Sequence, residues 1–292
     1  MPTYSIKDLE NLTGVQTHTI RIWEQRYNLL SPDRTATNNR VYSSEDLRKL
    51  MFAALLNNNG MKISKIAELS EDEINDAVLR LTASSDANTE SHIEKIKLIM
   101  VEMNEAHFEK MFSHLVLHYG FEEIVIRIII PLFKRLFYFR HTNSISISQM
   151  NFMNAMYKQK IYVAIDGLPP PKNPNHKTFI LFLPEREHFD LGLLFCNFMA
   201  RKRGFNTLYI GGNIPIRELQ DIIEKNPHSY LLSVASMTAT DLNEYYSYLL
   251  SLCNAKQKLF LTGNQIGTVT ITDPRLTIFH DYTEYKNFLD KL

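Results

Sequence analysis

Residues 178–202 are "TFILFLPEREHFDLGLLFCNFMARK", an apolar run of β-forming residues, a short polar loop and an apolar stretch with helical spacing. A strand that leads into a helix in this way is half of a β–α–β unit. The same alternation continues to the end of the chain. Predicted strands cover 178–183, 207–211, 230–235, 258–263 and 276–280, and predicted helices cover 190–202, 214–225, 240–253 and 282–292. The alternation predicts a doubly wound, five-stranded parallel α/β domain with helices on both faces of the sheet.

The chain before this domain divides at two breaks in composition. "GLPPPKNPNHK" (167–177) contains four prolines and cannot continue a helix, and "LTASSDANTES" (81–91) is polar and small. Between the breaks, helical spacing without any strand pattern predicts a four-helix bundle. Its helices are expected at about 92–102, 104–118, 120–139 and 146–166. The sequence therefore predicts a multidomain α plus α/β protein, with domains at 1–80, 91–168 and 176–292.

Composition excludes several classes of protein. The 292 residues include 45% hydrophobic residues, and 32 basic residues balance 32 acidic ones, so the chain is neither disordered nor basic overall. Cys196 and Cys253 lie in apolar segments and are expected to be buried free thiols in a reducing compartment. Neither a signal peptide nor a membrane span is evident, so we expect a cytoplasmic protein with no membrane partner.

The N-terminal residues predict a helix-turn-helix. Ser5-x-x-Asp8 is a capping box that begins one helix, and Gly14 can supply the turn after it. A second helix, "QTHTIRIWEQRY" (16–27), follows at once. Its periodicity places Ile20, Trp23 and Tyr27 inward and His18, Arg21, Ile22 and Gln25 outward. The second helix of such a pair inserts into the major groove of DNA.

The next segment, "NLLSPDRTATNNRVY" (28–42), predicts a wing in which Arg34 and Arg40 flank a polar tip. Residues 14–42 hold four arginines against Glu24 and Asp33, a local positive excess suited to phosphate. A further capping box, Ser43-x-x-Asp46, begins the helix after the wing.

The order G-V-x-x-x-T-I-R-x-W-E-x-R-Y, L-x-P-x-R and R-V-Y-S-x-x-D-L resembles the MerR family of winged helix-turn-helix regulators, in the variant typical of its CarH/LitR-type branch. The resemblance implies the following DNA-binding residues: phosphate clamps at Arg21, Trp23 and Arg40, the wing residues Arg34 and Tyr42, and base-edge contacts from His18, Thr19 and Gln25. The alternatives are core packing for Trp23 and solvated surface positions for the polar side chains.

Many MerR regulators dimerise through a long helix after these elements. Here "EINDAVLRL" (73–81) enters the polar linker instead, so self-association is expected from the later domains.

A bundle followed by a doubly wound domain resembles the cobalamin-binding modules of corrinoid methyltransferases and CarH/LitR-type photoreceptors. Those modules carry the motif D/E-x-H-x-x-G, whose histidine ligates cobalt. Here Glu187 takes the acidic place, Phe189 the histidine place and Gly192 the glycine place, while His188 stands one residue early. A phenyl ring has no lone pair to donate to a metal, and a local bulge is the alternative that would bring His188 back. Ser236 and Gly263 match the loops after the third and fourth strands.

The bundle residues that would face the upper side of the corrin also differ from the family. The photoreceptors carry Trp-His and, ten residues on, Glu-His. In this chain Arg140 takes the tryptophan place, His141 is kept, and Met150 and Asn151 replace the second pair. An exposed position at a helix end is the alternative for His141.

These patterns lead to three functional hypotheses. The first is a transcriptional regulator, a repressor, that binds promoter DNA as a dimer or tetramer and uses no cofactor. Its C-terminal module would serve oligomerisation or bind a partner protein or antirepressor. An oligomer is expected because one small winged domain buries too little surface for high affinity. The second is an adenosylcobalamin-dependent light sensor with His188 as a displaced cobalt ligand and no other metal site. The third, a corrinoid enzyme, is disfavoured because that chemistry needs a cofactor held by the missing residues.

Overall fold

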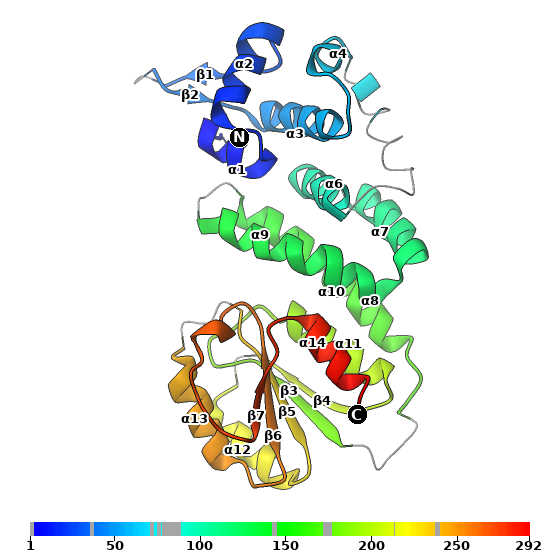
Figure 1. Cartoon of the computed structure of the whole chain (residues 1–292), viewed down its shortest axis with the longest axis vertical. Helices are drawn as coiled ribbons and strands as arrows, with labels where there is room; N and C mark the ends of the chain where they lie inside the picture. The colour runs from blue at the N-terminus through cyan, green and yellow to red at the C-terminus, as the bar shows by residue number, and fades with distance from the viewer. Residues whose placement is uncertain are drawn as a thin grey trace. The chain divides into compact units, whose positions relative to one another are not determined.

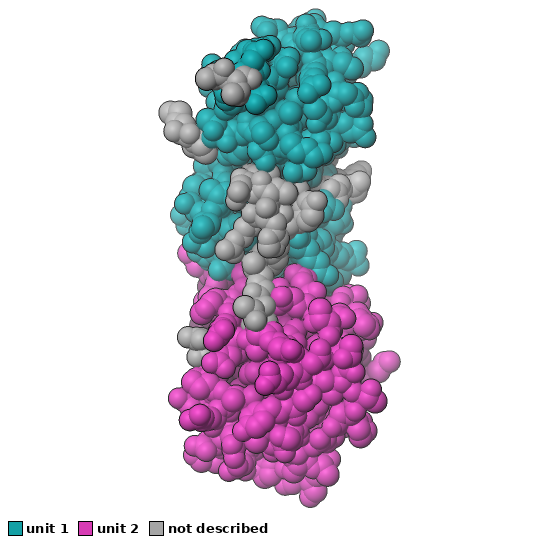
Figure 2. Space-filling model, turned by 90° about the vertical axis from the view of Figure 1, so that its left-hand side faces the viewer, with its two compact units in different colours: residues 1–156 teal, residues 157–292 magenta. Residues whose placement is uncertain are grey.

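The structure is a computed structural model that describes residues 3–35, 38–70, 73–74, 77, 89–141, 145–171, 177–212, 214–236 and 240–292 (Figure 1). The side chains of Glu90 and of residues 137–141 lie outside this description, as do the predicted linker from 81 to 88 and most of "EINDAVLRL". The chain divides into two compact units, Met1–Met156 and Tyr157–Leu292 (Figure 2).

The N-terminal domain is the predicted winged helix-turn-helix. Its elements are α1 (Ile6–Thr13), α2 (Thr17–Tyr27), β1 (Asp33–Arg34), β2 (Arg40–Val41), α3 (Ser44–Asn58) and α4 (Ile63–Ala67). Both predicted capping boxes are present, at Ser5 with Asp8 and at Ser43 with Asp46. Gly14 ends α1 with φ 72°, a conformation that favours glycine because a Cβ would be strained there. The antiparallel strands β1 and β2 form the wing.

The four helical segments predicted between residues 92 and 166 are all present. They are α6 (Thr89–Glu102), α7 (Glu105–Tyr119), the combined segment α8 (Phe121–Ile124), η1 (Val125–Ile129) and α9 (Ile130–His141), and α10 (Ile147–Asp166). Two details differ from the prediction. The helix α6 begins inside the predicted linker, and η1 is a π-helical turn within the third segment. In η1, Val125, Ile128 and Ile129 are buried.

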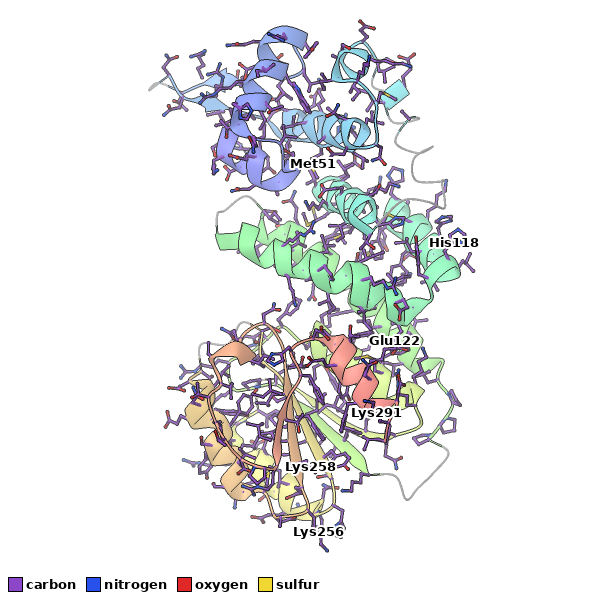
Figure 3. The ribbon with its side chains drawn as sticks, in the orientation of Figure 1. Met51, His118, Glu122, Lys256, Lys258 and Lys291 are labelled. Atoms are coloured by element: carbon purple, nitrogen blue, oxygen red, sulfur yellow. The ribbon has the colours of Figure 1, made fainter. Side chains whose placement is uncertain are left out.

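Most of the helix α6 is buried, including every residue from Ser91 to Met100 except the half-buried Glu94. It packs against α3 of the N-terminal domain and against η1 and α7. Met51, labelled in Figure 3, is a buried residue of α3. Two lysines of α6 are buried as well: Lys95 and Lys97. Lys97 donates from Nζ to Glu94 Oε1 at 2.6 Å and to the carbonyl of Leu12 in the last turn of α1 at 3.3 Å. The N-terminal domain and the first bundle helix are thus joined by an apolar contact and by a charge-assisted hydrogen bond.

The second unit contains the predicted parallel sheet, in the strand order β4-β3-β5-β6-β7. The strands are β3 (Thr178–Phe182), β4 (Asn206–Gly211), β5 (Tyr230–Val234), β6 (Lys258–Thr262) and β7 (Leu276–Ile278). The helices α11 (Leu191–Lys202) and α14 (Tyr282–Leu289) cover one face, and α12 (Ile216–Lys225) and α13 (Leu242–Leu252) cover the other (Figure 1). Figure 3 labels Lys256 and Lys258 at the amino end of the strands. The candidate ligand loops follow the opposite, carboxyl end.

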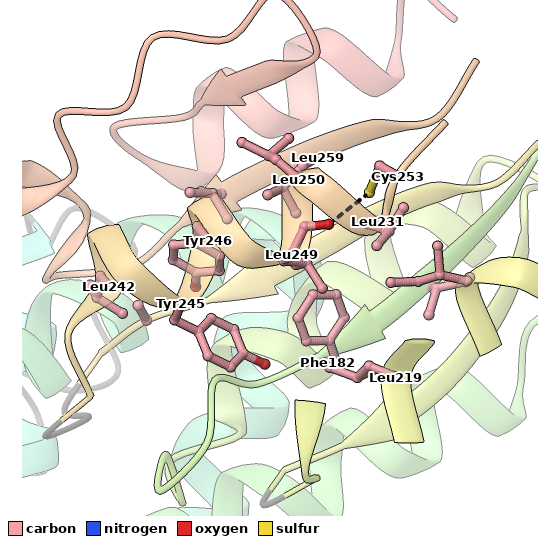
Figure 4. Packing of buried hydrophobic residues seen from close by; sticks show 14 of the residues in the cluster. Phe182, Leu219, Leu231, Leu242, Tyr245, Tyr246, Leu249, Leu250, Cys253 and Leu259 are labelled. Atoms are coloured by element: carbon pink, nitrogen blue, oxygen red, sulfur yellow. Dashed lines mark hydrogen bonds between the residues drawn. The ribbon is translucent and has the colours of Figure 1, made fainter. Parts of the chain in front are cut away.

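The core beneath α12 and α13 is apolar and aromatic (Figure 4). Within this core, Tyr246 Oη donates to Ser233 Oγ at 2.9 Å and Cys253 Sγ donates to the carbonyl of Leu249 at 3.3 Å. The buried hydroxyl of Tyr245 has no hydrogen-bond partner among the described residues. Both cysteines are free and buried, as predicted, and burial raises the pKa of the Cys196 thiol well above its ordinary value.

Candidate nucleic-acid interface

The exposed face of α2 is polar and basic. Ile20 and Trp23 are buried, whereas His18, Arg21 and Gln25 are exposed, as the periodicity predicted. Tyr27, which was also predicted to face inward, is only half-buried. Exposed residues of α2 that the prediction of DNA contacts left out are Ile22 and Arg26. Thr19 is half-buried and lies toward the side of the helix. The exposed face can supply hydrogen-bond donors and acceptors to base edges and positive charge to phosphates.

The carboxylate of Glu24 joins α2 to the wing. Its Oε1 and Oε2 accept hydrogen bonds from Arg40 Nε at 3.0 and 3.1 Å, and Oε2 also accepts one from Tyr42 Oη at 3.1 Å. Both bonds from Arg40 use Nε, and no terminal nitrogen of Arg40 donates a hydrogen bond within the described part of the chain. The terminal nitrogens therefore retain donors that could bind a phosphate oxygen.

Tyr42 is a structural part of this connection. Its side chain is fully buried, and its backbone pairs with that of Tyr4 ahead of α1. Burial and the adjacent Glu24 carboxylate raise the pKa of Tyr42 well above its ordinary value, so the hydroxyl remains a donor at physiological pH. The start of α1, the wing and α2 are thereby fixed to one another.

The tip of the wing closes on itself. Thr35 N donates to the carbonyl of Asn39 at 2.9 Å, and Asn38 N donates to the carbonyl of Thr35 at 2.8 Å. The exposed Arg34 donates from Nη1 to Asn38 Oδ1 at 2.7 Å. Arg34 thus lies on the wing as predicted, and this hydrogen bond holds its guanidinium next to the tip.

In the α/β domain, Glu187 bridges the loops that follow β3 and β5. Its side chain is only 1% exposed, and its Oε1 and Oε2 accept the backbone N–H of Phe189 at 2.9 Å and of Ser236 at 2.8 Å. Thr240 Oγ1 also donates to the carbonyl of Glu185 at 2.5 Å. The strands β3 and β5 are neighbours whose helices go to opposite faces, so these loops meet at the switch point where doubly wound sheets bind ligands.

The β3–α11 loop contains the position at which the resemblance to cobalamin-binding modules would expect a cobalt-ligating histidine. Phe189 is half-buried, and His188, one residue earlier, is exposed. Arg186 has φ 64°, so the loop makes a tight turn just before Glu187. The side chain of His141 lies outside the described residues. Among the residues that are described, no group of three or more His, Cys, Asp or Glu could hold a metal ion.

Two glycines lie where there is no space for a side chain: Gly192 in the first turn of α11 and Gly263 just after β6. A Cβ on Gly192 would overlap Tyr282 Oη, and the ring of Tyr282 lies 5.8 Å from that of Phe195. A Cβ on Gly263, where φ is 121°, would overlap the backbone of Ala235. The space beside α11 at Gly192 is therefore filled by an aromatic side chain of this chain itself.

The second half of α10 also meets the β3–α11 loop. Lys158 Nζ lies 2.9 Å from Asp190 Oδ2, and both side chains are mostly buried. Asp190 precedes α11, and its charge helps to raise the pKa of the half-buried Tyr209, after the larger effect of desolvation. No helix in the described part of the chain is long and apolar enough to span a bilayer.

Comparison with known proteins agrees with the helix-turn-helix fold of the N-terminal domain. The family model "MerR HTH family regulatory protein" matches residues 4–73. The HTH-type transcriptional repressor CarH of Myxococcus xanthus is 25% identical over 255 residues, which cover 83% of this chain and 82% of CarH. The repressor CarA of the same organism is 22% identical over 221 residues, which cover 75% of this chain and 71% of CarA.

Among solved structures, the monomethylamine corrinoid protein of Methanosarcina barkeri superposes with a TM-score of 0.54 at 16% identity, over 70% of this chain and 100% of that one. At this identity the likeness establishes the fold alone. Together, the N-terminal fold and the family match define a MerR-type helix-turn-helix domain in residues 4–73. Over most of its length this chain is similar to the CarH and CarA repressors, and behind the helix-turn-helix domain its fold resembles that of the corrinoid protein.

Proposed function

We propose that the chain is a sequence-specific DNA-binding regulator, a repressor, whose C-terminal module works without cobalamin. In this proposal α2 enters the major groove and places His18, Thr19 and Gln25 near base edges. The phosphate contacts come from Arg21, Arg34 and Arg40, whereas the buried Trp23 packs in the core of the domain. One observation supports the DNA-binding part of this proposal: the Glu24 carboxylate holds Arg40 of the wing beside an exposed basic face of α2.

The donor set of the β3–α11 loop does not fit cobalamin held in the family's manner. Phe189 supplies no nitrogen at the ligand position, and the carboxylate of Glu187 is already bonded to two backbone N–H groups. The same bonds support a fixed arrangement of the two loops that needs no ligand. We therefore assign this module to self-association as a dimer or tetramer, or to a protein partner such as an antirepressor.

The test begins with selection of binding sites by the full chain from a pool of random duplexes. One sequence should be enriched, and its affinity should fall steeply with salt because phosphate contacts release counterions. Adenosylcobalamin, in darkness or after illumination, should leave the affinity unchanged. Without an enriched sequence, the DNA-binding proposal fails. An affinity that changes with cobalamin or light would contradict only the cobalamin-independent part.

A second candidate is the adenosylcobalamin-dependent light sensor with His188 as a displaced ligand. The exposed position of His188 in a loop with a tight turn favours it. It predicts a coloured complex when the pure protein is mixed with adenosylcobalamin in darkness, and loss of the colour in His188→Ala.

A further inference from the structure

The exposed face of α2 contains one large apolar side chain. Ile22 is 42% exposed, although Ile20 on the opposite face of the same helix is fully buried. Helical geometry places Ile22 about 40° from His18 and about 60° from Gln25 around the helix axis. Ile22 thus lies inside the strip of residues that would face the bases, and the core of the domain does not explain its apolar character.

The major groove offers an apolar partner for such a side chain. Its other distinguishing groups are hydrogen-bond donors and acceptors, which isoleucine cannot satisfy, whereas thymine presents its C5-methyl group there. We propose that Ile22 packs on a thymine methyl group and is a specificity-determining residue. This inference rests on the proposed DNA-binding function and deepens it, because it names the base that this position of α2 recognises.

The decisive probe is the duplex that selection enriches, with each thymidine replaced in turn by deoxyuridine. This replacement removes the methyl group and keeps the Watson–Crick pairing. With the wild-type chain, one position should weaken binding about fourfold, the effect of removing one buried methyl group. Ile22→Ala should bind the unmodified duplex about fourfold or more weakly and should lose the difference between thymidine and deoxyuridine at that position. Ile22→Val should give an intermediate difference.

Gln25→Ala is the matched control on the same face. It should weaken binding to the selected duplex but keep the deoxyuridine effect at the position assigned to Ile22. An enriched sequence without any deoxyuridine-sensitive position overturns the inference and leaves the proposed function standing. A sensitive position that persists in Ile22→Ala overturns it as well. If no sequence is enriched at all, both proposals fail together.

Discussion

Glu24 in α2 and Arg40 in β2 form an ion pair in which Arg40 Nε lies 3.0 Å from Glu24 Oε1, with both side chains mostly shielded from solvent. The pair sets the wing at a fixed distance from the candidate recognition helix. Dissolved salt screens the electrostatic attraction of a partly shielded ion pair less than that of a fully exposed one. This contact should therefore persist at the ionic strengths used in DNA-binding experiments.

The first prediction concerns the hydroxyl of Tyr42. Tyr42→Phe removes one hydrogen bond to Glu24 and keeps the buried ring, so it should lower the free energy of unfolding by about 1–2 kcal/mol. Urea denaturation followed by tryptophan fluorescence measures this directly, because Trp23 is the only tryptophan of the chain and lies in this domain. An unchanged unfolding midpoint would show that the hydrogen bond from Tyr42 to Glu24 contributes nothing to the stability of the domain.

The second prediction concerns the charge of Arg40. If Arg40 neutralises one phosphate, Arg40→Ala should reduce the slope of log affinity against log salt by about one. Arg40→Lys keeps the charge and should keep the slope. The comparison variant is Arg127→Ala, which removes an exposed arginine paired with Glu123 in the bundle. Equal slopes for Arg40→Ala and the wild type would place Arg40 away from the DNA.

The third prediction tests the contact between Gly192 and Tyr282. Gly192→Ala drives a methyl group into Tyr282 Oη and should destabilise the second unit by about 1–3 kcal/mol. Gly267→Ala is the matched control, since nothing lies within 4 Å of a Cβ built there. Adding Tyr282→Phe removes the obstructing oxygen and should restore part of the stability. Thermal unfolding followed by circular dichroism would distinguish the four proteins, and a harmless Gly192→Ala would contradict the packing.

The fourth prediction compares neighbouring residues of the β3–α11 loop. Glu187→Gln places an NH₂ group against one of two N–H donors and should destabilise the loop by on the order of 2 kcal/mol. Hydrogen exchange should then speed up at the amides of Phe189 and Ser236. His188→Ala, at an exposed position, should leave both amides protected. Fast exchange in the wild type would mean that the carboxylate does not hold the loops together.

The fifth prediction is a pH dependence caused by Lys95. Burial lowers its pKa to about 8 from an ordinary value of 10.5. Between these values the unfolded chain binds more protons than the folded one, so the contribution of Lys95 to stability should rise as pH increases from about 8 to 10.5. Lys95→Met should therefore be more stable than the wild type at pH 7, with a difference that narrows above pH 8. A melting-temperature difference independent of pH would contradict this.

Elements with strong local signals could be predicted from the sequence. Both capping boxes, the first two helices of the N-terminal domain and all five strands of the sheet occur within one or two residues of the expected places, because caps and periodicity are local properties. The start of α6 at Thr89 was missed because its first residues are small and polar. The π-helical turn was missed because the mostly apolar segment Val125–Ile129 gives no sequence signal that separates a π-helical turn from an α-helix.

Contacts between distant residues could not be predicted. Glu24 and Arg40 are 16 residues apart, and their pairing depends on how the wing folds back on α2. The same holds for Tyr282, which reaches Gly192 from the last helix. Ile22 carried a signal that the prediction of DNA contacts did not use, namely an apolar residue on the outward face.

The polar segment before α6 connects two domains without making them independent. Because α6 lies against α3 on one side and against the bundle on the other, the DNA-binding domain and the bundle share part of one hydrophobic core. A recombination event that joined this N-terminal domain to a foreign protein at residues 81–88 would leave α3 uncovered. During evolution the two domains are therefore expected to be inherited as a pair, and substitutions in α3 to be compensated in α6.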